Sequence, residues 1–398
     1  RNLASWRAVS QLLYRAEAAG EVAVQELSSM LPVALLDPRP GDAVCDLCAA
    51  PGSKSLQILE AIGDGSADGH GGGSGFLLAN ELDERRAEAL AARLQRDGGA
   101  LAAKCAVTSC NAAVFPALYA CERVPPRSAP AAAPALCADE LATAVRHRLA
   151  RGGHAPPPAR PAESSTAWYH RHKLKFKRVL ADAPCSGDGT VRKNPDIWAS
   201  WSAARGVANF PRQLAILRRA LELLEDGGRC VYSTCSLNPI ENEAVVAAAI
   251  ALHNKTKAEQ GGGYVYLEDA HALLAARMPG LPAEALARGA SEWRVPSPRF
   301  AAEAPTLFFD WGEVPPSLRA QRSKVRAAEA AAAAEGREGR GPYLRQEMFP
   351  ACGRDAGVDP TRCVRVLPSE RVDTGGFFAA ALTKRTAAGP CAGAGADA

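Results

Sequence analysis

The sequence has no apolar run that approaches the ~20 residues of a membrane span, so we expect no membrane partner. Its first four residues also lack the layout of a secretory signal peptide. Twelve cysteines are present, but they are scattered singly along the chain. Cys45 and Cys48 form a C-x-x-C pair, yet the second ligand pair that a structural zinc site needs is missing. We therefore predict no metal site and a reducing compartment that keeps the thiols reduced.

The rest of the composition is that of an ordinary globular protein. At 398 residues with 47% hydrophobic content, the chain can form one large α/β domain with insertions, or two domains. A net charge of +4 permits a nucleic-acid partner without requiring one. Residues 170–178 hold five Lys and Arg in nine positions. Such a cluster is as typical of a solvated loop as of a surface that contacts phosphates.

Short apolar runs alternate with helical patterns along the chain, which predicts a doubly wound α/β fold. Two further runs flank the turn residues 373–376 and predict an antiparallel edge pair at the end of the sheet. Together they indicate a Rossmann-like seven-stranded sheet with a C-terminal hairpin, a pattern more typical of methyltransferases than of dehydrogenases. The expected strands are 43–48, 76–80, 103–107, 176–182, 230–232, 363–367 and 377–382, and the expected helices lie within 1–30, 53–62, 83–96, 210–224 and 245–252.

Three segments of biased composition interrupt this pattern. A glycine-rich stretch covers about 63–75, an Ala/Pro/Arg-rich stretch covers 117–169, and an Ala/Glu/Arg-rich stretch covers about 319–341. Such segments bury too little apolar surface to form a core of their own. We expect them to be insertions, and we expect 117–169 to be disordered.

Two cysteines follow predicted strands at the point where each strand ends. Cys185 lies in the segment Asp182–Gly187, and Cys235 lies in Ser233–Ser236. Because the carboxyl ends of neighbouring parallel strands face one crevice, we expect both thiols to lie there together. A single cysteine at a strand end is more often a small buried hydrophobe. Two of them, each in a long motif, favour a nucleophile with a partner.

The first predicted strand leads into a helix through a turn of small residues, Cys48-Ala49-Ala50-Pro51-Gly52-Ser53-Lys54. This turn has neither the G-x-G-x-x-G nor the G-x-x-x-x-G-K-[ST] pattern, so a dinucleotide or a triphosphate is not indicated. Small side chains let the backbone approach a ligand closely. Glu81 and Asp83, after the second strand, could bond ribose hydroxyls. An adenosine-bearing ligand without pyrophosphate fits these features, and S-adenosylmethionine (SAM) is the natural candidate.

Several long motifs, in the same order along the chain, resemble the Sun-family RNA cytosine-5 methyltransferases. Further segments are similar to the branch of that family that methylates tRNA. The family motifs are Asp46–Lys54, Asp182–Thr190 and Tyr232–Glu243, and the branch motifs are Arg192-Lys193-Asn194, Trp198 and Asp373–Phe378.

The resemblance implies a SAM-dependent transfer of a methyl group to carbon 5 of cytosine through a covalent cysteine adduct at carbon 6. Cys235 would be the nucleophile, Cys185 would assist product release, and Asp182 would contact the target base, which must leave its stack. Arg192 and Lys193 would bind the RNA. The implied cofactor-binding residues are Cys48, Ala49, Ala50, Pro51, Gly52, Ser53, Lys54, Glu81, Asn111 and Asp182.

Two positions depart from the family pattern, which usually has aspartate at both. Glu81 is one methylene longer and can still reach a ribose, and Asn111 can accept a hydrogen bond without carrying charge. These departures leave open a second interpretation, a catalytically weak RNA-binding scaffold of the same fold. Ribosomal or messenger RNA also remains an alternative to tRNA as the partner.

The resemblance further implies a division of the chain. We expect residues 1–30 to be the helical end of a truncated N-terminal RNA-binding region, 31–386 to be the methyltransferase domain, and 387–398 to be a disordered tail. We also expect a monomer and a nuclear location.

Overall fold

The computed structural model describes residues 3–19, 22, 24–63, 75–124, 168–260, 262–298, 306–319, 343–368 and 374–386. The chain divides into two compact units. The first takes residues 1–25, 37–179 and 223–225, and the second takes 26–36, 180–222 and 226–398.

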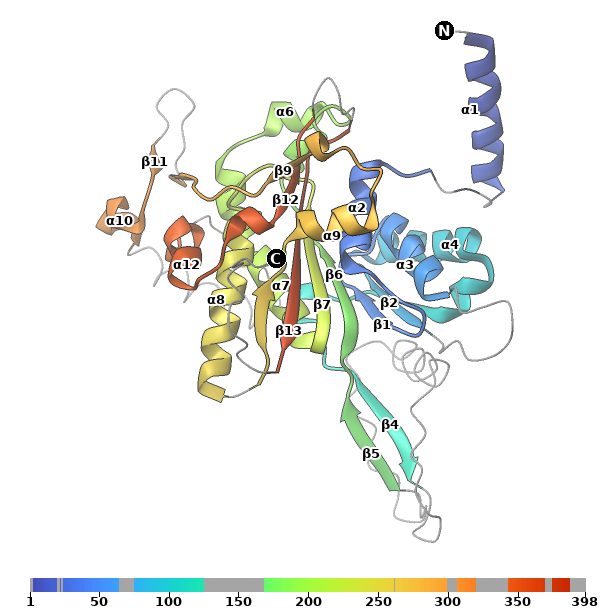
Figure 1. Ribbon diagram of the computed structural model, residues 1–398, viewed down its shortest axis with the longest axis horizontal. Coiled ribbons are helices and arrows are strands. Elements are labelled where there is room, and N and C mark those ends of the chain that lie inside the picture. Colours follow the sequence, from blue (N-terminus) through green and yellow to red (C-terminus); the bar gives the residue numbers. More distant parts are fainter. Residues whose placement is uncertain are drawn as a thin grey trace, which may run out of the picture. The chain divides into compact units, whose positions relative to one another are not determined.

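A mixed sheet of nine strands carries the fold, which confirms the predicted Rossmann-like α/β class with antiparallel C-terminal strands (Figure 1). The strand order is β3-β2-β1-β6-β7-β13-β12-β9, and β8 also pairs with β13. Seven of these strands are the predicted ones, and β8 and β9 are short additions. Their bounds are β1 Ala43–Asp46, β2 Phe76–Asn80, β3 Cys105–Thr108, β6 Phe176–Asp182, β7 Leu224–Thr234, β8 Tyr264–Leu267, β9 Leu286–Arg288, β12 Val364–Val366 and β13 Phe377–Arg385.

In the first unit, β1, β2 and β3 pair in parallel, with Ala43 opposite Phe76 and Leu77 opposite Cys105. Helix α3 (Ser53–Gly63) follows β1, and α4 (Glu84–Gly98) follows β2. Asp83 caps α4 by accepting a hydrogen bond from the backbone N–H of Arg86. The other helical elements of this unit are α1 Leu3–Ala18, η1 Gly99–Lys104 and η2 Ala112–Val114.

The composition of the segment 117–169 predicts disorder, but regular structure is present at both of its ends. Strand β4 (Tyr119–Val124) pairs with β5 (Trp168–Lys173) in an antiparallel ribbon, and residues 125–167 lie outside the described residues. The expectation of disorder is therefore wrong at the two ends. Each end carries aromatic residues, Tyr119 at one end and Trp168 and Tyr169 at the other, which favour strands.

In the second unit, β13 is an internal strand, and the expectation of an edge pair is wrong for it. It runs antiparallel to β7, with Ala379 opposite Ser233, and also pairs antiparallel with β8 and β12. Residues 377–382 are all buried. A continuous apolar run of this kind is typical of a strand that is covered on both faces.

Helices surround these strands within the second unit (Figure 1). Helix α2 contacts β13 and α9, and α8 contacts α12 and β8. Helix α2 continues to Leu36, past the boundary expected after residue 30. The bounds are α2 Leu27–Leu36, α6 Asp196–Ser200, α7 Ala204–Leu223, α8 Glu243–Gln260, α9 Ala270–Arg277, α10 Pro316–Arg319 and α12 Pro350–Asp355. Shorter elements are β10 Val295–Pro296, β11 Leu307–Phe308, η3 Asp188–Thr190, η4 Ala283–Ala285, η5 Trp311–Glu313, η6 Gln346–Met348 and η7 Pro360–Arg362.

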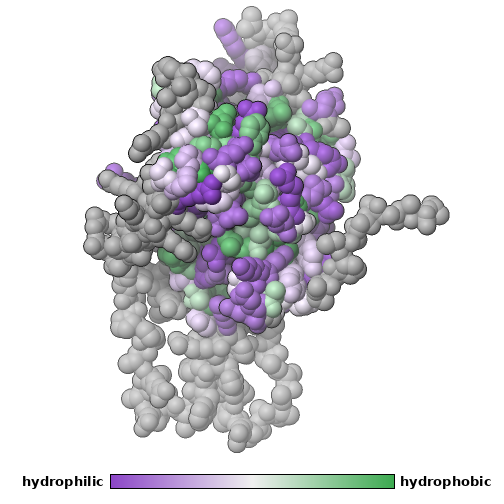
Figure 2. Space-filling model, turned by 90° about the vertical axis from the view of Figure 1, so that its left-hand side faces the viewer, coloured by the Kyte–Doolittle hydropathy of each residue, from purple (hydrophilic) through white to green (hydrophobic). Residues whose placement is uncertain are grey.

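Figure 2 shows a face on which hydrophilic side chains surround small apolar patches. Within the described parts of the chain, none of the helices has the length and apolar character needed to cross a bilayer.

Candidate active site

The second unit brings Cys185 and Cys235 together, as expected from their places after two strands. Strand β6 ends at Asp182 and β7 ends at Thr234, and the Ala183 N–H donates to the Ser233 carbonyl over 2.9 Å. The two Sγ atoms lie 3.4 Å apart. Both side chains are half-buried. Two thiols in contact at the end of a sheet are arranged to act on one ligand.

Glycine at position 189 allows three backbone segments to meet beside the thiols. The Gly189 N–H donates to the Cys235 carbonyl over 2.9 Å, and the Gly376 N–H donates to the Gly189 carbonyl over 2.7 Å. A Cβ at position 189 would lie 2.7 Å from the Cys235 oxygen and closer still to the Gly376 oxygen. The loop that holds Cys185, the loop that holds Cys235 and the start of β13 are thereby fixed to one another.

The surroundings of Cys185 disfavour its thiolate. The hydrogen bond with Cys235 raises the pKa of the Cys185 thiol well above its usual value, and burial and the charges of Cys235 and Glu241 act in the same direction. The backbone N–H of Gly187 opposes this shift without overcoming it. Near neutral pH, Cys185 therefore holds its proton and can serve as a hydrogen-bond donor.

Two aspartates lie on the same loops. Asp182 Oδ1 accepts a hydrogen bond from the Ser233 hydroxyl at 2.6 Å, which holds the carboxylate at the end of β6. Asp188 joins the two cysteine loops, because its Oδ1 accepts from the Leu237 N–H over 2.7 Å. Its Oδ2 accepts from the Trp201 indole N–H over 3.3 Å. The sequence indicated Asp182, but nothing in it indicated the role of Asp188.

Glu241 is a third acidic group at this site, and it was missed by reasoning from the sequence. It is fully buried and accepts hydrogen bonds from the residue after each cysteine, Ser186 and Ser236. Asn209 and Gln213 on α7 donate to it as well, over 2.7 and 3.0 Å. Its place in the motif 232–243 was the available signal, but a motif does not say which way a carboxylate points.

The residues expected to contact RNA lie after the Cys185 loop. Arg192 and Lys193 are exposed, and Lys193 forms an ion pair with Glu26. Burial opposes the shift, but hydrogen bonds from Lys193 and from the Gly375 N–H lower the pKa of Glu26 below its usual value. Glu26 therefore links Lys193 to the backbone just before β13, and the Lys193 ammonium already has a carboxylate partner within the protein.

Helix α6 presents two exposed tryptophans beside this segment. Trp198 is 75% exposed and Trp201 is 44% exposed. Ile197, between the basic pair and these rings, packs toward the Cys185 loop, where a Cβ at Gly187 would lie 3.3 Å from its Cδ1. Gly187 also has a φ of 73°, a backbone conformation that favours glycine. Helix α6 therefore packs against the Cys185 loop and leaves aromatic side chains exposed to solvent.

Seven of the expected cofactor residues, Cys48 to Lys54, lie in the first unit, in the turn from β1 into α3. Gly52 has a φ of 103°, and a Cβ there would lie 2.8 Å from Leu90 Cδ1, so only glycine fits. Ala49 is buried and bonded through its N–H to the Asn80 carbonyl over 2.8 Å. Pro51 is exposed, and the side chains of the other turn residues (Cys48, Ala50, Ser53 and Lys54) are half-buried.

Glu81 and Asn111, the two departures from the family pattern, both have local partners. Glu81 is buried, and its Oε1 accepts from the Asp83 N–H over 3.2 Å and lies 3.4 Å from the Arg86 guanidinium. Asn111 is exposed, and its Oδ1 caps η2 by accepting from the Ala113 N–H over 3.0 Å. An ordered carboxylate at the end of β2 fits the two hydroxyls of a ribose. The small-residue turn and Glu81 together fit an adenosine-bearing group.

Asn80 organises this region and was also missed. It is fully buried, and its Nδ2 donates to the Leu47 and Cys110 carbonyls over 2.9 Å each. Its Oδ1 accepts from the Thr108 hydroxyl and the Cys110 N–H. One amide thus connects the ends of β1, β2 and β3, where the cofactor residues begin.

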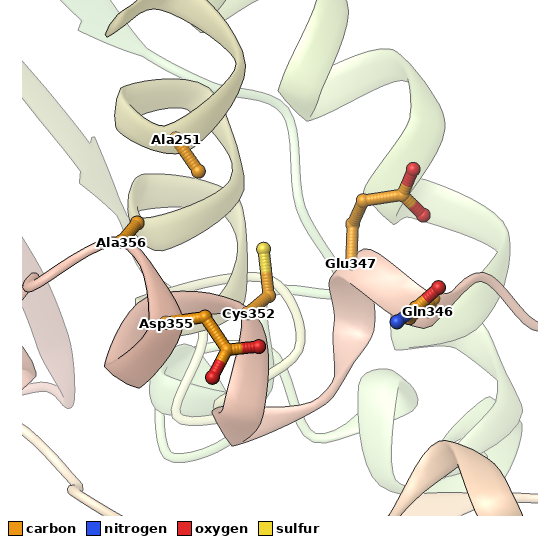
Figure 3. A pocket seen from close by; sticks show the side chains of 6 residues that line it. All are labelled: Ala251, Gln346, Glu347, Cys352, Asp355 and Ala356. Atoms are coloured by element: carbon orange, nitrogen blue, oxygen red, sulfur yellow. The ribbon is translucent and has the colours of Figure 1, made fainter. Parts of the chain in front are cut away.

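A separate pocket of about 350 Å³ lies between α8 and the segment that contains α12 (Figure 3). Burial, followed by the charges of Glu347 and Asp355, raises the pKa of its Cys352 thiol to about 11. This thiol is therefore a poor nucleophile at neutral pH. Across the described ranges, no cluster of three or more His, Cys, Asp or Glu side chains is placed to hold a metal ion.

Comparison with known proteins identifies relatives of the chain. A family model described as 16S rRNA methyltransferase RsmB/F matches residues 162–263, which include both cysteines. A tRNA (cytosine(34)-C(5))-methyltransferase of Drosophila melanogaster is 34% identical over 369 residues, covering 92% of this chain and 37% of the relative. A multisite-specific tRNA:(cytosine-C(5))-methyltransferase of Saccharomyces cerevisiae is 37% identical over 233 residues, covering 58% of this chain and 27% of the relative.

Two further proteins resemble the chain over most of its length. A multisite-specific tRNA:(cytosine-C(5))-methyltransferase of Schizosaccharomyces pombe is 32% identical over 374 residues, 92% of this chain and 43% of the relative. A crystal structure of a methyltransferase homolog from Pyrococcus horikoshii superposes with 19% identity and a TM-score of 0.44, covering 92% of this chain and 69% of that one. The chain thus spans less than half the length of each of the three curated relatives.

The chain thus combines a Rossmann-like α/β sheet with two thiols in contact at the ends of β6 and β7. Residues 162–263 match the RsmB/F, or Sun, methyltransferase family, and the three curated relatives are named as tRNA cytosine-5 methyltransferases.

Proposed function

We propose that this chain transfers a methyl group from SAM to carbon 5 of cytosine in RNA, and that tRNA is its substrate. The observation that carries the proposal is the 3.4 Å contact between the Cys185 and Cys235 sulfurs, inside the segment that matches the family model. The names of three curated relatives support tRNA as the substrate.

Cys235 is the proposed nucleophile. Carbon 5 of cytosine is too weak a nucleophile to take a methyl group unaided. Addition of a thiolate at carbon 6 makes an enamine whose carbon 5 can attack. The motif resemblance assigns the bond to Cys235, and the raised pKa of Cys185 agrees with a partner thiol that keeps its proton while Cys235 attacks.

Cys185 is the proposed group that completes the reaction. After methyl transfer, carbon 5 still carries a proton, and its removal lets the Cys235 sulfur leave carbon 6. The largest cause of the raised Cys185 pKa is its hydrogen bond with Cys235, and that bond is lost while the Cys235 sulfur is bonded to carbon. Cys185 therefore gives up its own proton to water more readily once the adduct has formed. The resulting Cys185 thiolate can then take the proton from carbon 5.

Three further residues are proposed to hold the RNA. Asp182, fixed by the Ser233 hydroxyl, accepts a hydrogen bond from the exocyclic amine of the extruded cytosine. Arg192 and Lys193 contact phosphates beside the site. The ion pair with Glu26 limits the contribution of Lys193 to RNA binding, because an ammonium that is already paired with a carboxylate neutralises less phosphate charge.

The small-residue turn 48–54, Glu81 and Asn111 of the first unit are the residues proposed to hold SAM. When bound, SAM supplies an activated methyl group attached to a sulfonium. Gly52 lets the turn backbone lie close to the ligand, and Glu81 accepts from the ribose hydroxyls. Asn111 reaches the adenine amine with the lone pair that is not used by the Ala113 N–H.

Methyl transfer from methyl-labelled SAM into total tRNA tests the proposal, with nucleoside analysis of the digested RNA. The expected product is 5-methylcytosine, and Cys235→Ala protein should form none. Label in ribosomal RNA but not in tRNA would overturn the choice of substrate. No label in any RNA would favour the RNA-binding scaffold instead.

A further inference from the structure

Glu241 gathers an unusual number of donors for a buried carboxylate. Its side chain is 0% exposed. Oε1 accepts from the Ser186 N–H at 2.9 Å, from Asn209 Nδ2 at 2.7 Å and from Gln213 Nε2 at 3.0 Å. Oε2 accepts from the hydroxyls of Ser186 and Ser236, the latter at 2.7 Å. Hydrogen bonds to a charged acceptor are stronger than those between neutral groups.

The donors belong to the two loops that carry the thiols. Ser186 directly follows Cys185, and Ser236 directly follows Cys235. The two serine hydroxyls also lie 3.0 Å from each other. From α7, Gln213 Nε2 reaches the Pro184 carbonyl over 3.0 Å as well, so it holds the other side of Cys185. One carboxylate thus ties together the segments on which both sulfurs depend.

Glu241 is itself fixed in place. The Tyr232 hydroxyl donates to its carbonyl over 2.6 Å, and its own N–H donates to the Asn238 carbonyl over 3.0 Å. Tyr232 is a fully buried residue of β7. Glu241 lies on the loop that carries Cys235, and the Tyr232 hydrogen bond anchors this part of the loop to the sheet.

We propose that Glu241 is a positioning residue that holds the Cys185 and Cys235 loops at the spacing at which both thiols reach one cytosine. The inference rests on the proposed function, because it assigns Glu241 to the same reaction. Glu241 itself touches neither the RNA nor the cofactor in this role. Its charge also contributes to the raised pKa of Cys185, after the contact with Cys235 and burial.

Glutamine and alanine at position 241 separate this role from general stability. In Glu241→Gln, the amide oxygen can accept from the three N–H donors, and the amide NH₂ can donate to the two serine hydroxyls, which rotate to accept. In Glu241→Ala, all five donors lose their acceptor. Glu243→Gln is the matched control, since Glu243 is equally buried but bonds Arg365 and the Ala290 N–H instead of Ser186 and Ser236.

The spacing of the sulfurs can be measured without RNA. Diamide oxidises two thiols to a disulfide, taking up two electrons and two protons on its N=N bond, and peptide mapping quantifies the Cys185–Cys235 disulfide. The sulfurs need to close from 3.4 Å to about 2.05 Å. We expect wild-type rates in Glu241→Gln and Glu243→Gln, and at least a tenfold slower rate in folded Glu241→Ala. A wild-type rate in folded Glu241→Ala would overturn the inference.

Steady-state methyl transfer to total tRNA gives the second readout. We expect Glu241→Ala to lower kcat at least tenfold with the KM for tRNA unchanged, and Glu241→Gln to restore most of kcat. If Glu241→Ala does not fold, the double variant Ser186→Ala/Ser236→Ala takes its place, with the same expected loss and the same overturning result. A wild-type protein that methylates no RNA, but whose disulfide rate depends on Glu241 as expected, would refute the proposed function and leave the positioning role standing.

Discussion

Among single residues, the two thiols of the site differ in their surroundings although their sulfurs touch. Cys185 contacts Cys235, is partly buried and lies near the charge of Glu241, and each of these raises the pKa of its thiol. Besides their mutual contact, both cysteines are held through the residues that follow them, Ser186 and Ser236. The chemistry therefore depends on residues that never touch the substrate.

Gly189→Ala tests how closely the loops meet. A Cβ at this position would lie 2.7 Å from the Cys235 carbonyl oxygen, so either the Cys235 loop or the Gly376 backbone must move. We expect a loss of about 1–3 kcal/mol in the free energy of unfolding, measured by urea denaturation, together with a large loss of methyl transfer. Gly280→Ala is the control, because a Cβ at Gly280 meets nothing within 4 Å. Equal stability and activity in the two variants would refute the close approach.

At the scale of elements, α6 places aromatic surface next to the Cys185 loop. The Trp201 ring is oriented by Asp188, which also bonds the Cys235 loop, and half of the ring stays in solvent. An exposed, oriented indole is suited to stack on a base of single-stranded RNA.

Trp201→Ala is therefore expected to raise the KM for tRNA about 5- to 100-fold, since stacking contributes about 1–3 kcal/mol per base. Trp201→Phe keeps an aromatic ring but loses the hydrogen bond to Asp188, so its KM for tRNA should lie between those of the unmodified protein and Trp201→Ala. Phe309→Ala, which removes an aromatic side chain that is 55% exposed, should leave KM unchanged. Equal KM values in all three variants would show that α6 does not contact the RNA.

An ion pair joins Glu243, the first residue of α8, to Arg365 in β12. Arg365 donates to both Glu243 oxygens at 2.6 Å, and the Glu243 side chain is fully buried. Glu243→Ala leaves the Arg365 charge without its carboxylate, and we expect a loss of about 3–5 kcal/mol in the free energy of unfolding. Guanidinium denaturation measures it. A loss below about 1 kcal/mol would mean that water or another acceptor replaces Glu243.

Most elements could be predicted from the sequence, because periodic apolar runs and turn residues mark them. The elements that were missed have weak local signals. β8 and β9 have four and three residues, and the ends of the ribbon β4–β5 adjoin a segment of biased composition. Strand β13 is internal because it pairs with β7, β8 and β12. These partners lie far from it in the sequence, so the residues of β13 alone do not predict them.

The site could be predicted in part for a similar reason. Strand ends indicated that Cys185 and Cys235 lie together, and their motifs indicated the chemistry. Asn80 and Glu241 could not be predicted, because their importance lies in hydrogen bonds to residues far along the chain. A polar residue next to a strand is equally compatible with solvent until the fold shows that it is buried.

For the whole molecule, buried thiols link stability to alkaline pH. Burial raises the pKa of Cys230 and, with the charge of Glu243, that of Cys363, above the usual value of 9.0. A raised pKa in the folded state means that the contribution to stability is complete below about pH 9 and is lost as the pH rises above it. We expect the free energy of unfolding, measured by urea denaturation, to fall between pH 9 and 10. Cys230→Ala should reduce that slope, and an unchanged slope would contradict the account.

The central claim is that Cys235 bonds the RNA and that Cys185 releases it. Cys185→Ala protein, mixed with SAM and total tRNA and run on a denaturing gel, tests it most directly. A covalent protein–RNA band is predicted to accumulate, and to vanish in the Cys185→Ala/Cys235→Ala double variant. No band from Cys185→Ala, under conditions in which the unmodified protein methylates tRNA, would contradict the assignment of the two cysteines.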